Sequence, residues 1–237
     1  MSTAQHVAPE DRVVNFISTG RTDESSFEQS LAQVKNRRII SMDNLDACVF
    51  PEVLKSIATE TEALGFSMAS EPKTGALLKT LAASKQNGRF LELGTGTGSS
   101  AAWILDGMDQ QSFLVTVDND SALQDVARKH LGHDPRIEFV CEDGGIWIEK
   151  TQRQQFDFIF ADAWPGKFSR LDLVFNLLSV GGIYLVDDLL PQDSWPKGHA
   201  SKVPALLEEI ECKKGLVSVR IGWASGLMLV TKKNSSA

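Results

Sequence analysis

The sequence predicts an α/β fold built on a doubly wound, seven-stranded mixed sheet. From residue 89 onward, short apolar runs alternate with segments of helical spacing, which is typical of βαβ units and a parallel sheet. The first of these runs leads into the glycine-rich stretch FLELGTGTGSS at 90–100. The last two runs, 216–223 and 227–232, flank a short loop that contains a glycine, which predicts a C-terminal antiparallel hairpin.

The pattern locates each element of this Rossmann-like fold. Upstream of the sheet, helical spacing predicts helices over 24–33 and 51–64, and Ser70 with Pro72 predicts the start of a third. We therefore divide the chain into a mobile N-terminal segment (1–22), a helical cap (23–84) and a Rossmann-like core (85–237). The predicted strands of the core are 89–93, 113–118, 136–141, 156–161 and 181–187, followed by the hairpin, and its predicted helices are 99–108, 121–131, 144–151, 169–179 and 200–213.

Composition narrows the class of partner. A chain of 237 residues with 42% hydrophobic content can bury a sizeable core. Its net charge of −7 disfavours binding to the negatively charged backbone of nucleic acid. The three cysteines, Cys48, Cys141 and Cys212, are widely spaced and suggest neither a disulfide framework nor a zinc site. The first residues do not resemble a signal peptide, and no apolar run reaches membrane-spanning length. We expect a soluble cytoplasmic protein that binds a small molecule, and not nucleic acid or a membrane, with the oligomeric state open and a homodimer among the alternatives.

The glycine-rich turn is the first candidate binding feature. Gly94, Gly96 and Gly98 allow main-chain N–H groups to approach a ligand at the start of the following helix. Such a turn also occurs in dinucleotide-binding proteins, but the position of their third glycine is Ser99 here. The turn by itself therefore predicts a binding site without specifying the ligand.

Two acidic residues at strand ends extend this site. Asp118 ends the second predicted strand, where a carboxylate can accept both hydroxyls of a ribose, and the alternative is that it caps the helix near Ser121. Asp143 follows the third strand, where it can accept a hydrogen bond from an exocyclic amine such as that of adenine. Capping of the next helix is an equally good interpretation of Asp143.

Three more aspartates follow the fourth and fifth strands. Asp162 ends one strand and Asp187 and Asp188 end the next, so the three carboxylates meet at one edge of the sheet. Their mutual repulsion favours a cation between them, and oxygen ligands suit Mg²⁺, Mn²⁺ or Ca²⁺. The alternative is that one aspartate caps a helix, one contacts a cofactor and one is solvated.

Taken together, these motifs resemble the class I S-adenosylmethionine-dependent O-methyltransferases, and specifically the cation-dependent group that includes catechol and caffeoyl-CoA O-methyltransferases. The stretches that carry the resemblance are FLELGTGTGSS, FDFIFADAW (156–164) and GGIYLVDDLL (181–190), with Met68 and Gly75 matching a Met-containing lead-in.

The resemblance implies a role for each candidate residue. S-adenosylmethionine and a divalent cation, most often Mg²⁺, are the implied cofactors. The candidate catalytic residues are Asp162, which the resemblance supplies, and Lys167, whose position differs from that of the family's lysine. The residues implied to surround S-adenosylmethionine are Met68, Glu92, Gly94, Thr95, Gly96, Ser100, Asp118, Asn119, Asp143, Gly144 and Asp162. The implied metal ligands are Asp162, Asp187 and Asp188.

The chain departs from this family at two positions. Asp188 stands where the family usually has an amide, which adds a negative charge to the predicted metal site. Pro165 follows Trp164 where catechol O-methyltransferases have a lysine, and the first lysine is Lys167, which can take a proton or stabilise an oxyanion. Trp164, Trp195 and Trp223 are candidates for the wall of an acceptor pocket, with ordinary core packing as the alternative.

The predicted function is methyl transfer from S-adenosylmethionine to a hydroxyl of a small, aromatic molecule, assisted by a divalent cation. A metal-independent enzyme that methylates nitrogen or a carboxylate of a small molecule is the first alternative. A nucleotide-binding dehydrogenase is disfavoured by Ser99 and the terminal hairpin. A catalytically silent protein that holds the cofactor is a further alternative.

Overall fold

The computed structural model describes residues 48–234 of the chain, so the predicted segment 1–22 and the predicted helix 24–33 lie outside the described residues. The described helices are α2 (Leu54–Ala63), α3 (Pro72–Ala83), α4 (Ser99–Gly107), α5 (Ser121–Leu131), α6 (Gly144–Lys150), α7 (Leu171–Leu177) and α8 (His199–Cys212). The strands are β1 (Arg89–Leu93), β2 (Phe113–Asp118), β3 (Ile137–Cys141), β4 (Phe156–Ala161), β5 (Leu178–Val186), β6 (Leu216–Ile221) and β7 (Leu227–Lys232).

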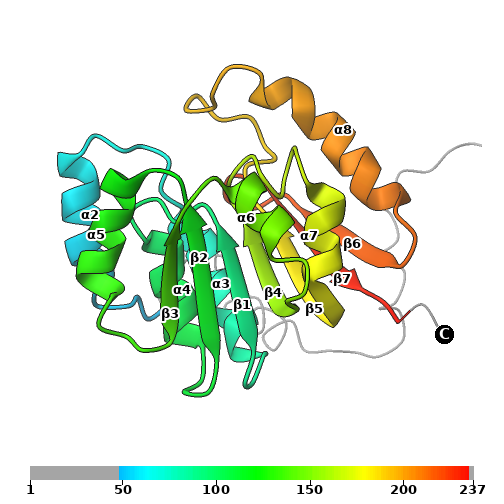
Figure 1. Ribbon diagram of the computed structural model, residues 1–237. Coiled ribbons are helices and arrows are strands. Elements are labelled where there is room, and N and C mark those ends of the chain that lie inside the picture. The colour runs from blue at the N-terminus through cyan, green and yellow to red at the C-terminus, as the bar shows by residue number, and fades with distance from the viewer. Residues whose placement is uncertain (1–47, 235–237) are drawn as a thin grey trace, which may run out of the picture. The chain divides into compact units, whose positions relative to one another are not determined.

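The strands form one mixed sheet in the order β3-β2-β1-β4-β5-β7-β6. The first five strands pair in parallel, whereas β7 is antiparallel to both β5 and β6. This arrangement confirms the predicted seven-stranded sheet with a C-terminal antiparallel hairpin. Figure 1 looks onto the face that carries α6 and α7, with α3 and α4 visible behind the strands.

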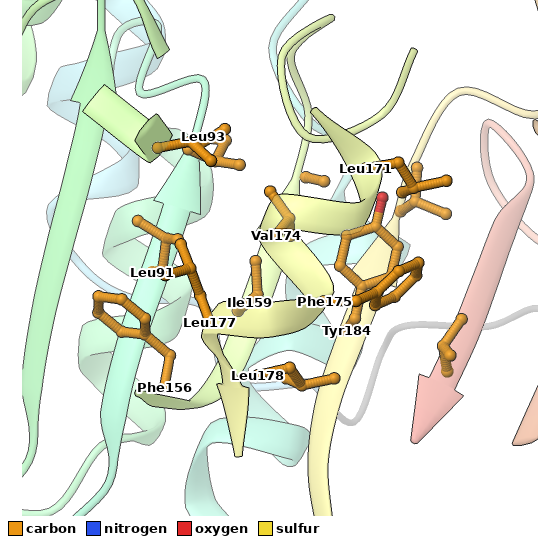
Figure 2. Close-up of a cluster of buried hydrophobic side chains, with 14 of the residues drawn as sticks. Leu91, Leu93, Phe156, Ile159, Leu171, Val174, Phe175, Leu177, Leu178 and Tyr184 are labelled. Carbon is orange, nitrogen blue, oxygen red and sulfur yellow. The ribbon is translucent and has the colours of Figure 1, made fainter. Parts of the chain in front are cut away.

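Alternating strand residues supply two cores, one on each face of the sheet. In β4, Phe158 and Phe160 belong to the cluster that α3 and α4 cover, whereas Ile159 and Ala161 belong to the cluster under α6, α7 and α8. Side chains on both faces are buried because a parallel sheet is covered by helices on each side. Figure 2 shows the second cluster, where side chains of α7 such as Val174 lie against strand residues.

Several element boundaries differ from prediction by one to three residues, and two of these differences have a clear local reason. Strand β5 begins at Leu178, immediately after α7, because Leu178 already pairs with Phe156 of β4. The pairing register between β4 and β5 shifts after this pair. Helix α3 has Glu71 rather than Ser70 at its N-cap, with Pro72 in the first turn as expected. The hydroxyl of Ser70 instead donates to Asp162 Oδ2 at 3.2 Å, which joins the start of this helix to the end of β4.

The reversal of strand order between β1 and β4 positions the site. From β1 the chain continues to β2 and then β3 on one side of β1, whereas β4 and β5 lie on the other side of β1. In open parallel sheets the ligand lies at such a point, beyond the carboxyl ends of the strands. Two backbone hydrogen bonds join the ends of neighbouring strands there. Asp162 N–H, after β4, donates to Leu93 O of β1 at 2.9 Å, and Gly94 N–H, after β1, donates to Val117 O of β2 at 2.9 Å.

Candidate functional site

A cavity of about 380 Å³ lies at the reversal point, a size typical of small-molecule sites. Its walls come from the segments that follow β1, β2, β3, β4 and β5, together with the residues before α3 and the start of α8. The candidate residues that line it are Met68, Gly94, Thr95, Gly96, Ser100, Asp118, Asn119, Asp143, Gly144, Asp162, Lys167 and Asp188. The structure therefore brings residues from distant parts of the sequence to one cavity.

The glycine-rich turn is shaped by close backbone approach. Gly94 has φ +103°, and a Cβ atom there would lie 2.7 Å from the carbonyl oxygen of Asp162. Gly96 has φ +50°, also in the left-handed region, and donates its N–H to Asp118 Oδ2 at 2.7 Å. The turn thus needs glycine both for conformation and for space, and its backbone forms the floor of the cavity.

The Asp118 carboxylate lies in the cavity wall and does not cap α5. Asp120 is the N-cap, accepting from the N–H groups of Ala122 and Leu123 at 3.0 and 3.1 Å. Asp118 accepts from Gly96 N–H and, through Oδ1, from Asp120 N–H at 2.9 Å. Each carboxylate oxygen has a second lone pair, so Asp118 retains the capacity to accept hydroxyl groups from a ligand.

Asp143 caps helix α6 and also lies in the cavity wall. Its Oδ1 accepts from Ile146 N–H at 3.0 Å, so it is the N-cap of α6. It also lines the cavity, together with Gly144 and Asn119. Capping and ligand contact are compatible, because only one of the carboxylate oxygens is used by the helix.

Glu92 does not line the cavity. Its side chain is fully buried beneath the turn, where Oε2 accepts from Thr116 Oγ1 at 2.5 Å and Oε1 has no hydrogen-bond partner in the described part of the chain. Thr116 in turn contacts Thr95 Oγ1 at 2.6 Å, and Gln124 donates to the same hydroxyl. Burial raises the pKa of Glu92 to about 7, because the charged carboxylate is removed from water. Glu92 therefore supports the turn from below.

The two residues of the Met-containing lead-in have different surroundings. Met68 is 54% exposed and lines the cavity. Gly75 lies inside α3, where a Cβ atom would come within 2.2 Å of Trp103 Nε1. Its small size allows α3 to pack on α4, which is a structural role away from the cavity.

Asp162, Asp187 and Asp188 come together at the end of β4 and β5, and we name them the carboxylate cluster. Asp187 is 2% exposed and accepts from Ser225 Oγ and from Asp188 N–H, the latter at 2.7 Å. Burial raises the pKa of Asp162 well above its ordinary value and that of Asp187 to about 6, and the neighbouring carboxylates reinforce both shifts. The three side chains therefore form one electrostatic unit.

Lys167 is the cation that faces this unit. It is only 2% exposed, its Nζ lies 3.7 Å from Asp188 Oδ2, and its charge opposes the raised pKa of both Asp162 and Asp187. Lysine is almost never fully buried unless it is paired. The ion pair with Asp188 and the open cavity beside it account for the position of this side chain.

The carboxylate cluster does not fit the predicted divalent cation in the geometry observed. Over residues 48–234, no group of three or more His, Cys, Asp or Glu side chains is arranged to hold a metal ion. Asp187 directs one oxygen to Ser225 and Asp188 N–H, and Lys167 already supplies a positive charge.

Sequence reasoning missed His199, which lies in the cavity wall at the start of α8. Its Nε2 donates to the carbonyl oxygen of Asp188 at 2.9 Å, and its ring stacks on Trp195 with centroids 4.3 Å apart. Burial lowers its pKa, which favours the neutral imidazole. A lone histidine after a Pro-Lys-Gly stretch carries no sequence signal of this kind, since only the packing of α8 brings it to Asp188.

The three candidate tryptophans lie in different surroundings. Trp164 lines the cavity directly, with Lys202 Nζ 5.3 Å from its ring centre. Trp195 supports the wall through its stacking on His199. Trp223 was expected within a strand but lies after the end of β6, where its backbone closes the turn to β7 by accepting from Gly226 N–H at 2.9 Å.

Comparison with known proteins agrees with the fold. A family described as a methyltransferase domain matches residues 91–189. Two mycobacterial proteins provisionally named O-methyltransferases are related to the chain. The protein of Mycobacterium sp. (strain KMS) is 31% identical over 101 residues, covering 41% of this chain and 46% of that protein. The protein of Mycobacterium leprae (strain Br4923) is 29% identical over 117 residues, covering 48% and 52%. The chain thus spans about half the length of these curated relatives.

Solved structures resemble a larger share of the chain. The O-methyltransferase of Bacillus cereus in complex with S-adenosylhomocysteine has a TM-score of 0.68 at 18% identity, covering 88% of this chain and 97% of that one. The O-methyltransferase TomG of Streptomyces achromogenes, in complex with S-adenosylmethionine, also has a TM-score of 0.68 at 18% identity, covering 88% and 96%. Within the described residues no helix has the length and apolarity to cross a membrane. Residues 91–189 therefore match a methyltransferase domain, and the chain has the fold of these two solved O-methyltransferases.

Proposed function

We propose that this protein transfers the methyl group of S-adenosylmethionine to a hydroxyl group of a small aromatic molecule. The observation that carries the proposal is a single cavity with two chemically different sides. Asp118 and Asp143 belong to the ends of β2 and β3 on one side of β1, whereas Trp164, Lys167 and Asp188 follow β4 and β5 on the other side. The first side suits a nucleoside, and the second suits a polar group attached to an aromatic ring.

The residues present fit the cofactor. Asp118 presents carboxylate oxygens beside the glycine-rich turn, where the two hydroxyls of a ribose need acceptors. The first two residues of α4, Ser99 and Ser100, also line the cavity, so the N-terminus of this helix borders the place of the ligand. When bound, S-adenosylmethionine supplies an activated methyl group and leaves as S-adenosylhomocysteine.

The contribution of the protein is then binding and orientation. Trp164 offers a flat apolar wall to an aromatic acceptor, and Lys167 Nζ offers donors to its oxygen. Because the 3.7 Å distance to Asp188 exceeds a hydrogen bond, the ammonium group has donors left for a ligand. Holding two reactants in line can contribute about 7–11 kcal/mol to catalysis in good cases.

Binding tests the first part of the proposal. We expect S-adenosylhomocysteine to bind in calorimetry and the Asp118→Ala variant to bind at least ~10-fold more weakly, because hydrogen bonds to a charged partner contribute ~1.5–3 kcal/mol each. Asp157→Ala is a matched control, since Asp157 also accepts a backbone N–H, from Arg89 at 2.9 Å, at the opposite end of the sheet. Equal loss in both variants would assign the effect to general destabilisation.

Measurement of turnover tests the second part of the proposal, which is methyl transfer to a hydroxyl group. Release of S-adenosylhomocysteine is measured with a panel of phenols, catechols, aromatic amines and aromatic carboxylic acids. Release with hydroxyl acceptors supports the proposal, whereas release only with amines or carboxylates assigns the chain to another methyltransferase class. Cofactor binding without release for any acceptor would identify a silent binding protein.

A further inference from the structure

The side chain of Lys167 is held in the carboxylate cluster by a rigid turn. Gly166, at φ +88°, donates its N–H to Ser169 O at 2.7 Å, and Lys167 N–H donates to Trp164 O at 3.2 Å. The hydroxyl of Tyr184, which is completely buried, donates to Gly166 O at 2.8 Å. These bonds fix the backbone on both sides of Lys167, so its position does not depend on a mobile surface loop.

The space around the turn is equally restricted. A Cβ atom at residue 166 would lie 2.4 Å from Leu93 Cδ1, so the turn packs directly on the end of β1. The ammonium group of Lys167 lies 5.7 Å from the centre of the Phe168 ring, and that ring contacts His199 edge-on at 4.8 Å. The ammonium group of the lysine therefore has both the Phe168 ring and the Asp188 carboxylate as neighbours.

The backbone at Asp188 turns the carboxylate cluster toward this lysine. Asp188 has φ +59°, in the left-handed region that few residues other than glycine, asparagine and aspartate adopt. In that conformation its N–H reaches Asp187 Oδ1, its carbonyl accepts from His199, and its Oδ2 faces Lys167 Nζ. The same residue thus ties the histidine, the second carboxylate and the lysine together.

We propose that Lys167 is the built-in cation of this site, occupying the electrostatic position of a divalent ion among Asp162, Asp187 and Asp188, so that the intact protein binds no divalent cation there. A second cation would have to enter against the ammonium charge and would find one carboxylate engaged by Ser225. The proposal about metal binding stands on the geometry of this cluster. Its consequence that Lys167 binds the oxygen of the acceptor rests on the proposed function.

The proposal predicts that removal of the lysine creates a metal site. The full chain, after treatment with a chelator and dialysis, is titrated with Mg²⁺, Ca²⁺ and Mn²⁺ by calorimetry and by thermal unfolding. We expect no saturable binding and no rise of Tm for the parent protein. Lys167→Met and Lys167→Gln leave three carboxylates without their cation, and we expect both to bind Ca²⁺ or Mn²⁺ saturably, at least ~10-fold more tightly than the upper limit that the titration sets for the parent.

Two controls assign the effect to the cluster. Lys150→Met removes a lysine that is 62% exposed and paired with Glu142 on the surface, and this variant should titrate like the parent. Adding Asp187→Asn and Asp188→Asn to the Lys167→Gln variant should abolish the binding gained, and asparagine is compatible with the left-handed backbone at residue 188.

Two results would overturn the proposal. One is saturable binding of a divalent cation by the parent protein that weakens when Asp187 and Asp188 become asparagine. The other is folded Lys167 variants with no more metal affinity than the parent, and if neither variant folds, the titration of the parent protein decides. S-adenosylhomocysteine binding, measured on the same samples, tests the proposed function separately, since its absence would refute that function and leave the metal result intact.

Discussion

Glu92 offers a quantitative test of how the buried polar network beneath the glycine-rich turn affects stability. Its carboxylate is fully buried, and burial raises its pKa from 4.5 to about 7. Between these two values the unfolded chain ionises at residue 92 while the folded chain holds the proton. The contribution of this residue to the free energy of unfolding is therefore most favourable below pH 4.5, falls as pH rises to about 7 and is constant above.

The size of the effect follows from the two pKa values. A difference of this size corresponds to about 3 kcal/mol. Glu92→Gln removes the titration and keeps the shape, and its carbonyl oxygen can still accept from Thr116. The free energy of unfolding of the variant, minus that of the parent, should therefore increase by about 3 kcal/mol from below pH 4.5 to pH 8.

Urea unfolding of the cofactor-free protein across this pH range measures the difference. With a typical urea m-value of about 1–3 kcal/mol/M, the relative midpoint should move by about 1–3 M. Glu138→Gln, in an exposed position of β3, is the control and should give a difference that does not depend on pH. A constant difference between Glu92→Gln and the parent would refute the reasoning, because it would mean that residue 92 has the same pKa in both states.

Two further predictions concern packing and capping. Gly75→Ala should lower the free energy of unfolding by about 1–3 kcal/mol, since the added methyl group meets the buried Trp103 ring at 2.2 Å. Gly222→Ala, where nothing lies within 4 Å, is its control, and equal Tm values for the two variants would contradict the packing. Asp120→Ala should cost about 0.5–2 kcal/mol in thermal unfolding through loss of the α5 cap, whereas Asp120→Ser should retain most of it. A similar loss in both Asp120 variants would show that the cap is not the cause.

Much of the sheet could be predicted because the signals are local. The bounds of β1, β2 and β4 match the predicted strands, since each is a mostly apolar run that ends at a polar or glycine residue. The short loop with a glycine between the last two strands predicts the antiparallel hairpin of β6 and β7. The order of alternating strands and helices is enough to predict a parallel sheet. The candidate residues at strand ends also followed, because the carboxyl ends of parallel strands share one edge.

The sequence by itself determined which residues reach that edge, but not which partners they find there. Only the tertiary structure separated Asp118, which faces the cavity, from Asp120, which caps α5, because both lie at the same strand end in the sequence. It likewise buried Glu92 beneath the turn and assigned Gly75 to helix packing. The position of Lys167 among the carboxylates and of His199 against Asp188 depends on contacts between segments far apart in the chain. Such contacts are set by how α7 and α8 pack on the sheet, and short-range patterns contain no information about that packing.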